Sequence, residues 1–468
     1  MKQKICFLII YLITFLTYSQ GIITVSEITI NGNKVTQENI ILREIVFKEN
    51  NSFSITELES KIKESKNNLI NLKLFNFVEI DYVLIGRKAK VTINLTERWY
   101  IWPYPVFEIS ERNFNSWWEE FKTSNYSDFS RLNYGLFLNW NNFRGKNEIV
   151  QLKIRRGFKE HYLLSYQMPY LNKKKTIGLN TNLQLFRRKK TFYQTTDNTL
   201  RYFEKNDEYT SIDHTINLEL LYRKGIDKKH KLKCYYFNSL IADSIAILNQ
   251  RYLNNDEKSG DYFKATYEFT QEKRDYIIYP LHGYFIEIGA SKYFKGSSPV
   301  NHFEFDIRAA KHIEPKKSIF LGSSIALKLT SKGYQPYFQQ EGFGFNDYVR
   351  GYEYYVIDGQ QFCLSKTILK YALVEKTNFE IPYMKMKQFK KSHYSIYLGI
   401  FSDMGYIKDS QNTANNPMQS MLLWGKGVSL DYVTYYDKLL RIEFSINHLG
   451  EKGVFLHFSN PFGSKKKL

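Results

Sequence analysis

The sequence has 468 residues, a formal net charge of +19 and many aromatic side chains, among them 37 tyrosines and 35 phenylalanines. After the N-terminal segment no apolar run approaches the roughly 20 residues that a transmembrane helix needs, so a helical membrane protein is excluded. The aromatic abundance favours a protein built of many half-apolar strands.

The N-terminus has the pattern of a secretory signal peptide, predicted over residues 1–19. Lys2 and Lys4 form a short basic start, the apolar run "ICFLIIYLITFLTY" follows, and Ser19 is small enough to precede a cleavage site. The run is too short to span a bilayer comfortably, and a retained anchor is the alternative. An exported chain rarely meets nucleic acid, so anionic lipid phosphates are the expected counter-charge for the basic surface.

Residues 23–98 are predicted to form a small α+β domain. Thr36 is expected to cap the first helix, and the second helix carries one apolar stripe that includes Leu58 and Leu69. The exposed edge of the sheet offers a place for an extended client peptide to add, and a spacer without client contact is the alternative. The predicted order is β-α-α-β-β, with a strand from residue 23, helices over 37–47 and 55–72, and strands over 77–85 and 90–98.

Residues 101–468 instead show a long series of alternating segments separated by polar loops. In "RIEFSINHL" (441–449) apolar residues fall on one face, and charged or polar residues fall on the other. A soluble sandwich would point the apolar face inward, whereas an outer-membrane barrel points it toward lipid. The signal peptide, the aromatic abundance and a count of about 16 segments favour a transmembrane antiparallel β-barrel. The expected fold class is therefore mainly β, with the α+β domain in front of the barrel.

One β-α-α-β-β domain before a barrel of about 16 strands resembles the BamA/TamA superfamily of outer-membrane assembly factors, which includes two-partner-secretion translocators. The N-terminal unit resembles a POTRA domain. The resemblance covers the whole mature chain, and four local motifs support it. It implies a bacterial outer-membrane location with the N-terminal domain in the periplasm.

The first motif is "VRGY", formed by Val349, Arg350, Gly351 and Tyr352. It resembles the motif on the family's long extracellular loop that folds back into the barrel. The resemblance implies that Asp403 receives the arginine. A guanidinium in a partly dehydrated lumen needs a carboxylate, and a forked contact is directional and charge-assisted. A solvated loop charge is the alternative for this arginine.

The second motif is "FSDMGY", in which Phe401, Asp403 and Gly405 resemble the family's Phe-x-Asp-x-Gly strand motif. The residues just before it, Leu398 and Ile400, belong to the face of the strand that is expected to meet lipid. Alternation along the strand therefore places Asp403 on the opposite face, which lines the lumen.

The third motif is a turn that enters a strand, in "KRDYIIYPLHGYFIEI". Arg274, Asp275, Pro280, Gly283 and Tyr284 resemble the family's Arg-Asp…Pro-x-x-Gly-Tyr pattern. The aspartate is expected to be a turn residue and not a chemical group.

The fourth motif is the last strand, "EKGVFLHFSNPF". Glu451, Gly453, Leu456 and Phe458 resemble the C-terminal signal by which barrels are recognised for assembly. The chain departs from the pattern at Leu456, where an aromatic is common, and it continues with "GSKKKL" after Phe462. The end of the last strand is therefore left open.

The sequence contains no enzyme signature: HExxH, GxSxG, a phosphate loop and metal-spaced cysteine–histidine clusters are all missing. No cofactor or metal is predicted, although His448 and His457 could face each other across the final hairpin. The mature chain keeps Cys234 and Cys363, which either form one disulfide or stay as two unreactive thiols; the second interpretation is simpler.

The resemblance implies a protein that inserts or translocates client polypeptides, captured at the domain's strand edge, with outer-membrane lipid and accessory periplasmic proteins or lipoproteins as further partners. With room for only one POTRA domain, the chain is interpreted as a specialised paralogue. The alternative is a passive channel or structural barrel, whose lumen would be lined by Arg441, Glu443, Glu304 and Arg308.

Overall fold

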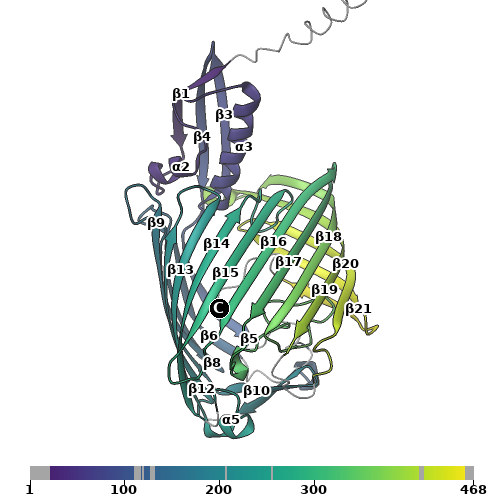
Figure 1. Ribbon diagram of the computed structural model, residues 1–468. Helices are drawn as coiled ribbons and strands as arrows, with labels where there is room; N and C mark the ends of the chain where they lie inside the picture. Colours follow the sequence, from purple (N-terminus) through teal and green to yellow (C-terminus); the bar gives the residue numbers. More distant parts are fainter. Residues whose placement is uncertain are drawn as a thin grey trace, which may run out of the picture.

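The computed structural model describes residues 22–109, 118, 121–126, 132–205, 208–254, 257–409 and 416–458. The predicted signal peptide and the tail after residue 458 lie outside the described residues. The described chain forms a small N-terminal domain and a large curved sheet, with the domain at one end of the sheet (Figure 1).

The N-terminal domain is a four-stranded mixed sheet with helices packed on it. Its strand order is β2-β1-β4-β3, in which β1 and β4 are parallel and the other pairs are antiparallel. Leu58 and Leu69 of the second helix are fully buried against the sheet. The elements are β1 (Ile23–Asn31), α2 (Glu38–Glu44), β2 (Ser52–Phe53), α3 (Ile55–Asn71), β3 (Phe75–Ile85) and β4 (Lys88–Glu97).

Two details of this domain differ from the sequence prediction. The two-residue strand β2 is too short to leave a periodic signal, and it adds an element to the expected order. Thr36 does not cap α2, because the N-cap position belongs to Gln37, whose side chain makes no capping bond. The Thr36 hydroxyl instead donates to Glu97 Oε1 at 2.6 Å and lies 3.1 Å from the hydroxyl of Tyr100.

The large sheet contains 16 antiparallel strands in a continuous order from β22 to β5, with a separate hairpin β10–β11 inserted after β9. It curls into a barrel (Figure 1). The strands are β5 (Ile101–Ile109), β6 (Leu132–Phe143), β7 (Glu148–Gly157), β8 (Lys159–Met168), β9 (Ile177–Arg188), β10 (Lys190–Thr196), β11 (Thr199–Glu204), β12 (Ser211–Tyr222), β13 (Lys228–Ile241), β14 (Ser259–Glu272), β15 (Gly283–Lys295), β16 (Phe303–Lys316), β17 (Ile319–Thr330), β18 (Gln361–Glu380), β19 (Lys391–Lys408), β20 (Leu422–Thr434), β21 (Lys438–Asn447) and β22 (Lys452–His457).

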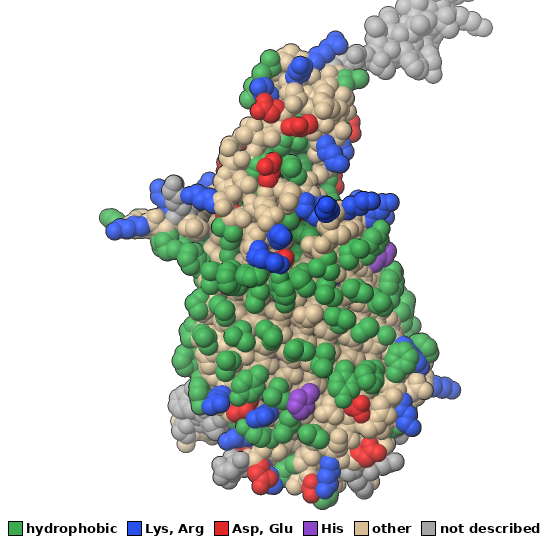
Figure 2. Space-filling model, turned by 90° about the vertical axis from the view of Figure 1, so that its left-hand side faces the viewer, with side chains coloured by type: hydrophobic (Ala, Val, Ile, Leu, Met, Phe, Trp, Pro, Cys, Tyr) green, Lys and Arg blue, Asp and Glu red, His purple; other side chains and the backbone are tan. Residues whose placement is uncertain are grey.

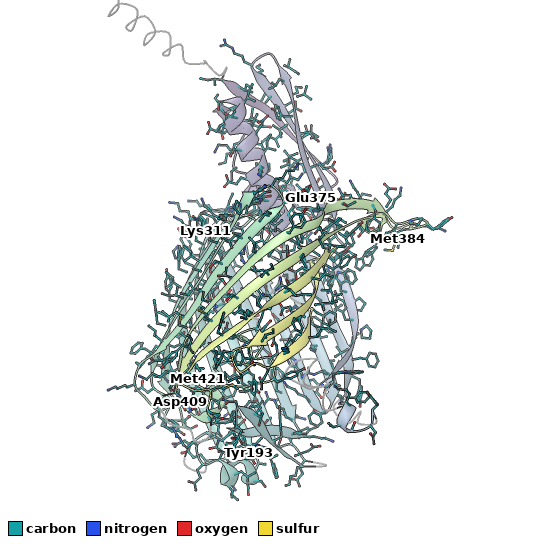
Figure 3. The ribbon with its side chains drawn as sticks, turned by 90° about the vertical axis from the view of Figure 1, so that its right-hand side faces the viewer. Tyr193, Lys311, Glu375, Met384, Asp409 and Met421 are labelled. Atoms are coloured by element: carbon teal, nitrogen blue, oxygen red, sulfur yellow. The ribbon has the colours of Figure 1, made fainter. Side chains whose placement is uncertain are left out.

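Short helical turns lie in the connections: α5 (Asp243–Leu248), the 3₁₀ helix η1 (Tyr337–Gln339) and α6 (Lys387–Lys390). The connections at Asp409, Met421 and Tyr193 lie at the end of the barrel away from the N-terminal domain, whereas Glu375 and Met384 lie at the domain's end (Figure 3). Among the described helices, none is long and apolar enough to cross a membrane.

The barrel is apolar outside and polar inside. In β21, Ile442 and Phe444 are exposed, while Arg441, Glu443 and Ser445 are fully buried. Exposed apolar residues also recur on other strands, and on the face seen in Figure 2 apolar side chains form a band across the barrel. This alternation confirms the predicted orientation and is the opposite of a soluble sandwich.

The sheet ends at β5 and β22, and the boundary between these two strands is called the seam here. Strand β22 has six residues and pairs with β21 from Ile446↔Lys452 to Arg441↔His457. Within the described residues, no backbone pairing joins β22 to the nine-residue strand β5. In this part of the chain β22 and β5 are therefore the two edges of the sheet, and no ladder of backbone hydrogen bonds closes the boundary between them.

The N-terminal domain is fixed to the turns of the barrel by polar contacts. Arg98 makes a forked ion pair with Asp437, in the β20–β21 turn, at 2.7 and 3.0 Å. Glu44 of α2 makes a second forked pair with Arg223, just after β12, with both distances 2.6 Å. Asn71, at the end of α3, donates to the carbonyl oxygens of the β14–β15 turn. Three separate turns thus hold one orientation of the domain.

The Arg98–Asp437 pair is expected to be largely independent of pH in the neutral range. Burial alone would raise the pKa of Asp437, but the guanidinium of Arg98 outweighs that effect and holds the pKa below its ordinary value of 3.8. A carboxyl group with a lowered pKa contributes its stabilisation above that ordinary value and loses it as the pH falls further. The contribution of this pair to domain docking should therefore weaken only below pH 3.8.

Replacing Arg98 by alanine should loosen the docked domain, because it leaves a largely buried carboxylate without its partner, at about 3–5 kcal/mol if burial is complete. Hydrogen exchange in the β20–β21 turn should rise by at least about tenfold. The matched control is Lys90→Ala, which removes an exposed ion pair with Glu27 on the same domain and should leave the turn unchanged. Equal exchange in both variants would contradict the assigned contact.

Candidate functional site

The connection between β17 and β18, residues 331–360, folds back into the barrel and is called the lumen loop here. Phe343, Val349 and Ile357 of this loop are buried in a common apolar cluster with wall residues that include Leu364 and Leu423. The loop therefore has its own packed contact with the inner face of the wall, and it occupies part of the lumen.

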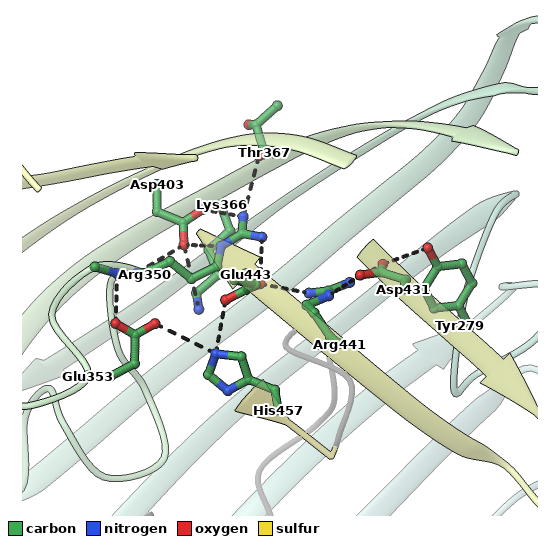
Figure 4. A network of polar contacts seen from close by, with 11 residues as sticks. Tyr279, Arg350, Glu353, Lys366, Thr367, Asp403, Asp431, Arg441, Glu443 and His457 are labelled. Atoms are coloured by element: carbon green, nitrogen blue, oxygen red, sulfur yellow. Dashed lines mark hydrogen bonds and ion pairs between the residues drawn. The ribbon is translucent and has the colours of Figure 1, made fainter. Parts of the chain in front are cut away.

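Arg350 is the central polar residue of the lumen loop. Its side chain is fully buried, as is that of Asp403 on β19. Arg350 Nε lies 2.8 Å from Asp403 Oδ2, and Nη2 lies 2.5 Å from Oδ1, which makes a forked ion pair (Figure 4). The guanidinium also lies 3.7 Å from the ring centroid of Phe401, two residues earlier on the strand. The structure thus brings three sequence-predicted site residues into one contact.

The ion pair belongs to a larger buried network on the inner wall. Glu443 Oε1 lies 3.5 Å from Nη1 of Arg350 and 3.4 Å from Nη1 of Arg441. Arg441 makes its own forked pair with Asp431 at 2.5 and 2.6 Å, and the hydroxyl of Tyr279 donates to Asp431 at 2.7 Å. Charged groups that would be costly alone in a dehydrated lumen are compensated by one another.

Small residues allow the lumen loop to lie directly on the wall. A Cβ atom at Gly425 would fall 1.7 Å from the carbonyl oxygen of Arg350, and one at Gly405 would fall 2.5 Å from Cγ2 of Val349. Gly351 has φ +92°, a left-handed conformation that favours glycine, and it turns the chain beside the ion pair. Tyr352 is buried and its hydroxyl contacts Nδ1 of His448.

The third sequence motif forms the β14–β15 turn at the end of the barrel that carries the N-terminal domain. Asp275 Oδ1 accepts backbone N–H groups of the turn, including that of His282 at 3.1 Å. Gly283 has φ +96°, and a Cβ atom there would meet the carbonyl oxygen of Lys273 at 2.0 Å. Arg274 is buried in an ion pair with Glu272, and the carbonyl of Pro280 accepts from Lys370 at 3.4 Å.

The fourth motif lies on and beside β22. Gly453 and Leu456 pair with β21, while Phe458 is 70% exposed just beyond the strand. Glu451 precedes the strand and accepts hydrogen bonds from Tyr355 and Asn447, both at 2.6 Å. The end of the C-terminal segment beyond residue 458 lies outside the described residues.

Sequence reasoning did not place several residues in this site. Glu353, directly after the first motif, lies 3.7 Å from His457 of β22, which lies 2.9 Å from Glu443 in the buried network. Lys366 of β18 lies 3.8 Å from Asp403. For Lys366 the signal in the sequence was a charged residue on the polar face of a strand, which locates a lumen residue but not its partner, whereas Glu353 lies in the loop and had no such signal. Cys234 and Cys363 are free, exposed thiols, so no disulfide joins them.

The barrel and the N-terminal domain each match the model of a known protein family. The model of the Omp85 superfamily domain matches residues 142–446. The chain belongs to the Omp85 superfamily. A second model, for the POTRA repeat described as a surface antigen variable number repeat, matches residues 23–98. The resemblance to the BamA/TamA superfamily is thereby confirmed.

Solved structures share this fold. BamA from Haemophilus ducreyi lacking POTRA domains 1–3 matches with a TM-score of 0.52 and 14% identity, over 93% of this chain and 84% of that chain. CdiB from Escherichia coli matches with a TM-score of 0.50 and 12% identity, over 95% and 90% of the two chains. A search of curated proteins found no match. At such identities the structural likeness shows the fold alone.

Membership of the Omp85 superfamily establishes the class of the protein and its cellular location. The protein is a non-enzymatic outer-membrane β-barrel of the transport and assembly class, with its POTRA domain in the periplasm. The end of the barrel that carries the POTRA domain is therefore periplasmic, and the lumen loop enters from the extracellular end (Figures 1 and 3).

Removing either partner of the Arg350–Asp403 pair should release the lumen loop. Arg350→Ala leaves a buried carboxylate uncompensated, at a cost of roughly 3–5 kcal/mol, and Arg350→Lys should fail to restore the forked contact. Hydrogen exchange over residues 343–358 is the measurement. The exchanged pair, Arg350→Asp with Asp403→Arg, should recover protection relative to either single change.

The control for this experiment is Lys390→Ala, which removes an exposed ion pair with Glu380 at the opposite end of the barrel and should not alter loop exchange. Unchanged protection in Arg350→Ala would show that apolar packing alone holds the loop.

A methyl group at Gly425 should displace the loop without changing any charge. The added Cβ of Gly425→Ala collides with the backbone of Arg350, so the loop or the strand must move. Gly289→Ala is the matched control, because its nearest neighbour is the Asp306 side chain at 3.7 Å. We expect raised exchange over residues 343–358 in Gly425→Ala alone, and equal exchange in both variants would contradict the close approach.

Proposed function

We propose that this Omp85 protein inserts or translocates client polypeptides at the outer membrane, as a specialised member with one POTRA domain. In this proposal residues 1–19 direct export, residues 23–98 capture an extended client, and residues 101–468 form the barrel that receives it. The observation that carries the proposal is the seam between β22 and β5.

The seam supports a lateral route for client strands. In hydrocarbon every unpaired backbone group costs several kcal/mol, so a strand edge there is an unfavourable surface that another strand can cover. The six-residue strand β22 has a short ladder with β21, and the described residues provide none with β5. A client strand that pairs at this edge gains the backbone hydrogen bonds that the lipid does not provide.

The POTRA domain supports client capture by strand addition. Strand β3 has eleven residues and lies at the edge of the sheet, with β4 as its neighbour on one side only. The C-terminal end of β3 carries exposed apolar side chains, of which Val83 is 64% and Ile85 is 58% exposed. An extended apolar client peptide could form backbone hydrogen bonds with this edge strand and pack its apolar side chains against these exposed residues.

The contents of the lumen count against a wide passive channel, which is the alternative function. The charges expected to line such a channel are engaged: Arg308 pairs with Asp347 of the lumen loop, and Glu304 lies 3.1 Å from Lys264. The lumen loop, which the Arg308–Asp347 pair helps to fix, occupies part of the lumen. Conductance in planar bilayers, with no effect of gene deletion on other proteins, would favour the channel.

Deletion of the gene tests the proposal directly. Comparative proteomics of outer-membrane and secreted fractions should show loss of specific surface or secreted proteins, since the chain is proposed to be specialised. An unchanged protein profile in both fractions would refute the assembly or translocation role.

Closing the seam by a disulfide should abolish the activity while the barrel stays folded. We would replace Cys234 and Cys363 by serine, place a cysteine at Phe107 of β5, and scan a second cysteine along β22. Client levels should fall when the bridge forms and recover on reduction. The control bridge joins β15 and β16, which are paired at Ile288↔Ile307, and it should have no effect. Full activity of the bridged seam would exclude a lateral route.

A further inference from the structure

Three side chains from separate segments converge on one point in the lumen. Glu353 belongs to the lumen loop, Glu443 to β21 and His457 to β22. One ligand atom from each lies within 4.8 Å of the other two. His457 Nε2 lies 2.9 Å from Glu443 Oε2 and 3.7 Å from Glu353 Oε1 (Figure 4). Two carboxylates and an imidazole thus face one another inside the barrel.

The two carboxylates are oriented by contacts at their other oxygen atoms. The backbone N–H of Gly351 donates to Glu353 Oε2 at 2.8 Å, which turns Oε1 toward the shared point. The guanidinium groups of Arg350 and Arg441 lie against Glu443 Oε1, which turns Oε2 to the same point. Metal ligands are commonly oriented in this way by a second layer of contacts.

The three ligand atoms lie close enough together for one ion to reach all of them. Glu443 Oε2 and His457 Nε2 are buried and 2.9 Å apart, yet they lack the alignment of a hydrogen bond. Zinc bonds of about 2.0–2.2 Å place the ligand atoms of a tetrahedral site about 3.3–3.6 Å apart. The 3.7 Å separation lies just beyond that range and the 2.9 Å separation is shorter than it, so a bound ion requires small shifts of these side chains.

Two carboxylate oxygens and one imidazole nitrogen are the groups that face this point. The guanidinium groups of Arg350 and Arg441 lie against the other oxygen of Glu443, so the oxygens that face the imidazole are the place where a cation would be held.

We propose that Glu353, Glu443 and His457 form a divalent-cation site of the zinc type, with water as the remaining ligand. An imidazole with two carboxylates is a donor set that suits Zn²⁺, and neutral histidine is the form that binds. The ion would join the lumen loop to the last two strands, beside the seam. The pair His448 and His457, which the sequence offered as facing residues, does not form this site, because His448 contacts Tyr352.

Zinc titration of the purified full-length chain in detergent tests the site. The background is Cys234→Ser with Cys363→Ser, because both thiols are exposed and could bind the metal themselves. After chelation and dialysis, one Zn²⁺ per chain should bind, and the thermal midpoint should rise with zinc concentration. Glu353→Gln and His457→Gln should each lose this equivalent, whereas the control His448→Gln should keep it.

Circular dichroism before titration checks that each variant keeps its strands. No stoichiometric zinc in the background protein would overturn the proposal and leave a proton on His457 as the compensating charge. Zinc that persists in both ligand variants would also overturn it, since the ion would then lie elsewhere.

A second measurement needs no lumen substitution. Zinc-edge X-ray absorption of the wild-type chain should show nitrogen and oxygen neighbours at about 2.0–2.2 Å. Sulfur neighbours at about 2.3 Å would place the ion at the cysteines and refute the assigned site.

Discussion

A buried guanidinium that meets a buried carboxylate is the interaction on which the inside of this barrel depends. Neither Arg350 nor Asp403 has access to solvent, so each needs the other's charge. Their forked contact fixes the position of the lumen loop along β19 as well as its distance from the wall. Once it is fixed, Val349 reaches the apolar cluster and Glu353 reaches β21 and β22.

The wall of the barrel is built to receive that contact. Strand alternation places apolar side chains in the lipid and leaves charged ones, such as Arg441 and Glu443, no environment other than the lumen. There they compensate one another and the arginine of the loop. Small residues at Gly405 and Gly425 let the loop backbone approach closely, so charge and shape specify the same position.

Much of this arrangement was predictable from sequence, for physical reasons. The alternation of apolar and polar residues depends only on the twofold period of a strand, so the barrel, its 16 strands and the lumen side of Asp403 followed from it. The contact between Asp403 and Arg350 was predicted from the motif resemblance. Neither the sequence of the lumen loop nor that of β19 indicates by itself that the two segments meet. Helix α3 was predicted by its apolar spacing and its ends matched to within one residue.

Other features have no local signal. Strand β2 is two residues long, and the side chain of Thr36 prefers Glu97 to the helix end that its position suggested. Glu353 and His457 meet through folding of the loop and through strand register, which no single segment encodes. Docking of the POTRA domain depends on turns at Arg223 and Asp437 that are far apart in the chain. Such contacts are properties of the assembled barrel.

The connection between the two parts of the chain is very short. Strand β4 of the POTRA domain ends at Glu97 and strand β5 of the seam begins at Ile101, so three residues separate them. A peptide held on the POTRA sheet is consequently tethered close to the strand where the barrel is least closed. Tethering over a short span raises the local concentration of a ligand to about the millimolar range, independently of its abundance in the periplasm. Under the proposed function, a client with weak affinity for either part alone would still pass efficiently from one to the other.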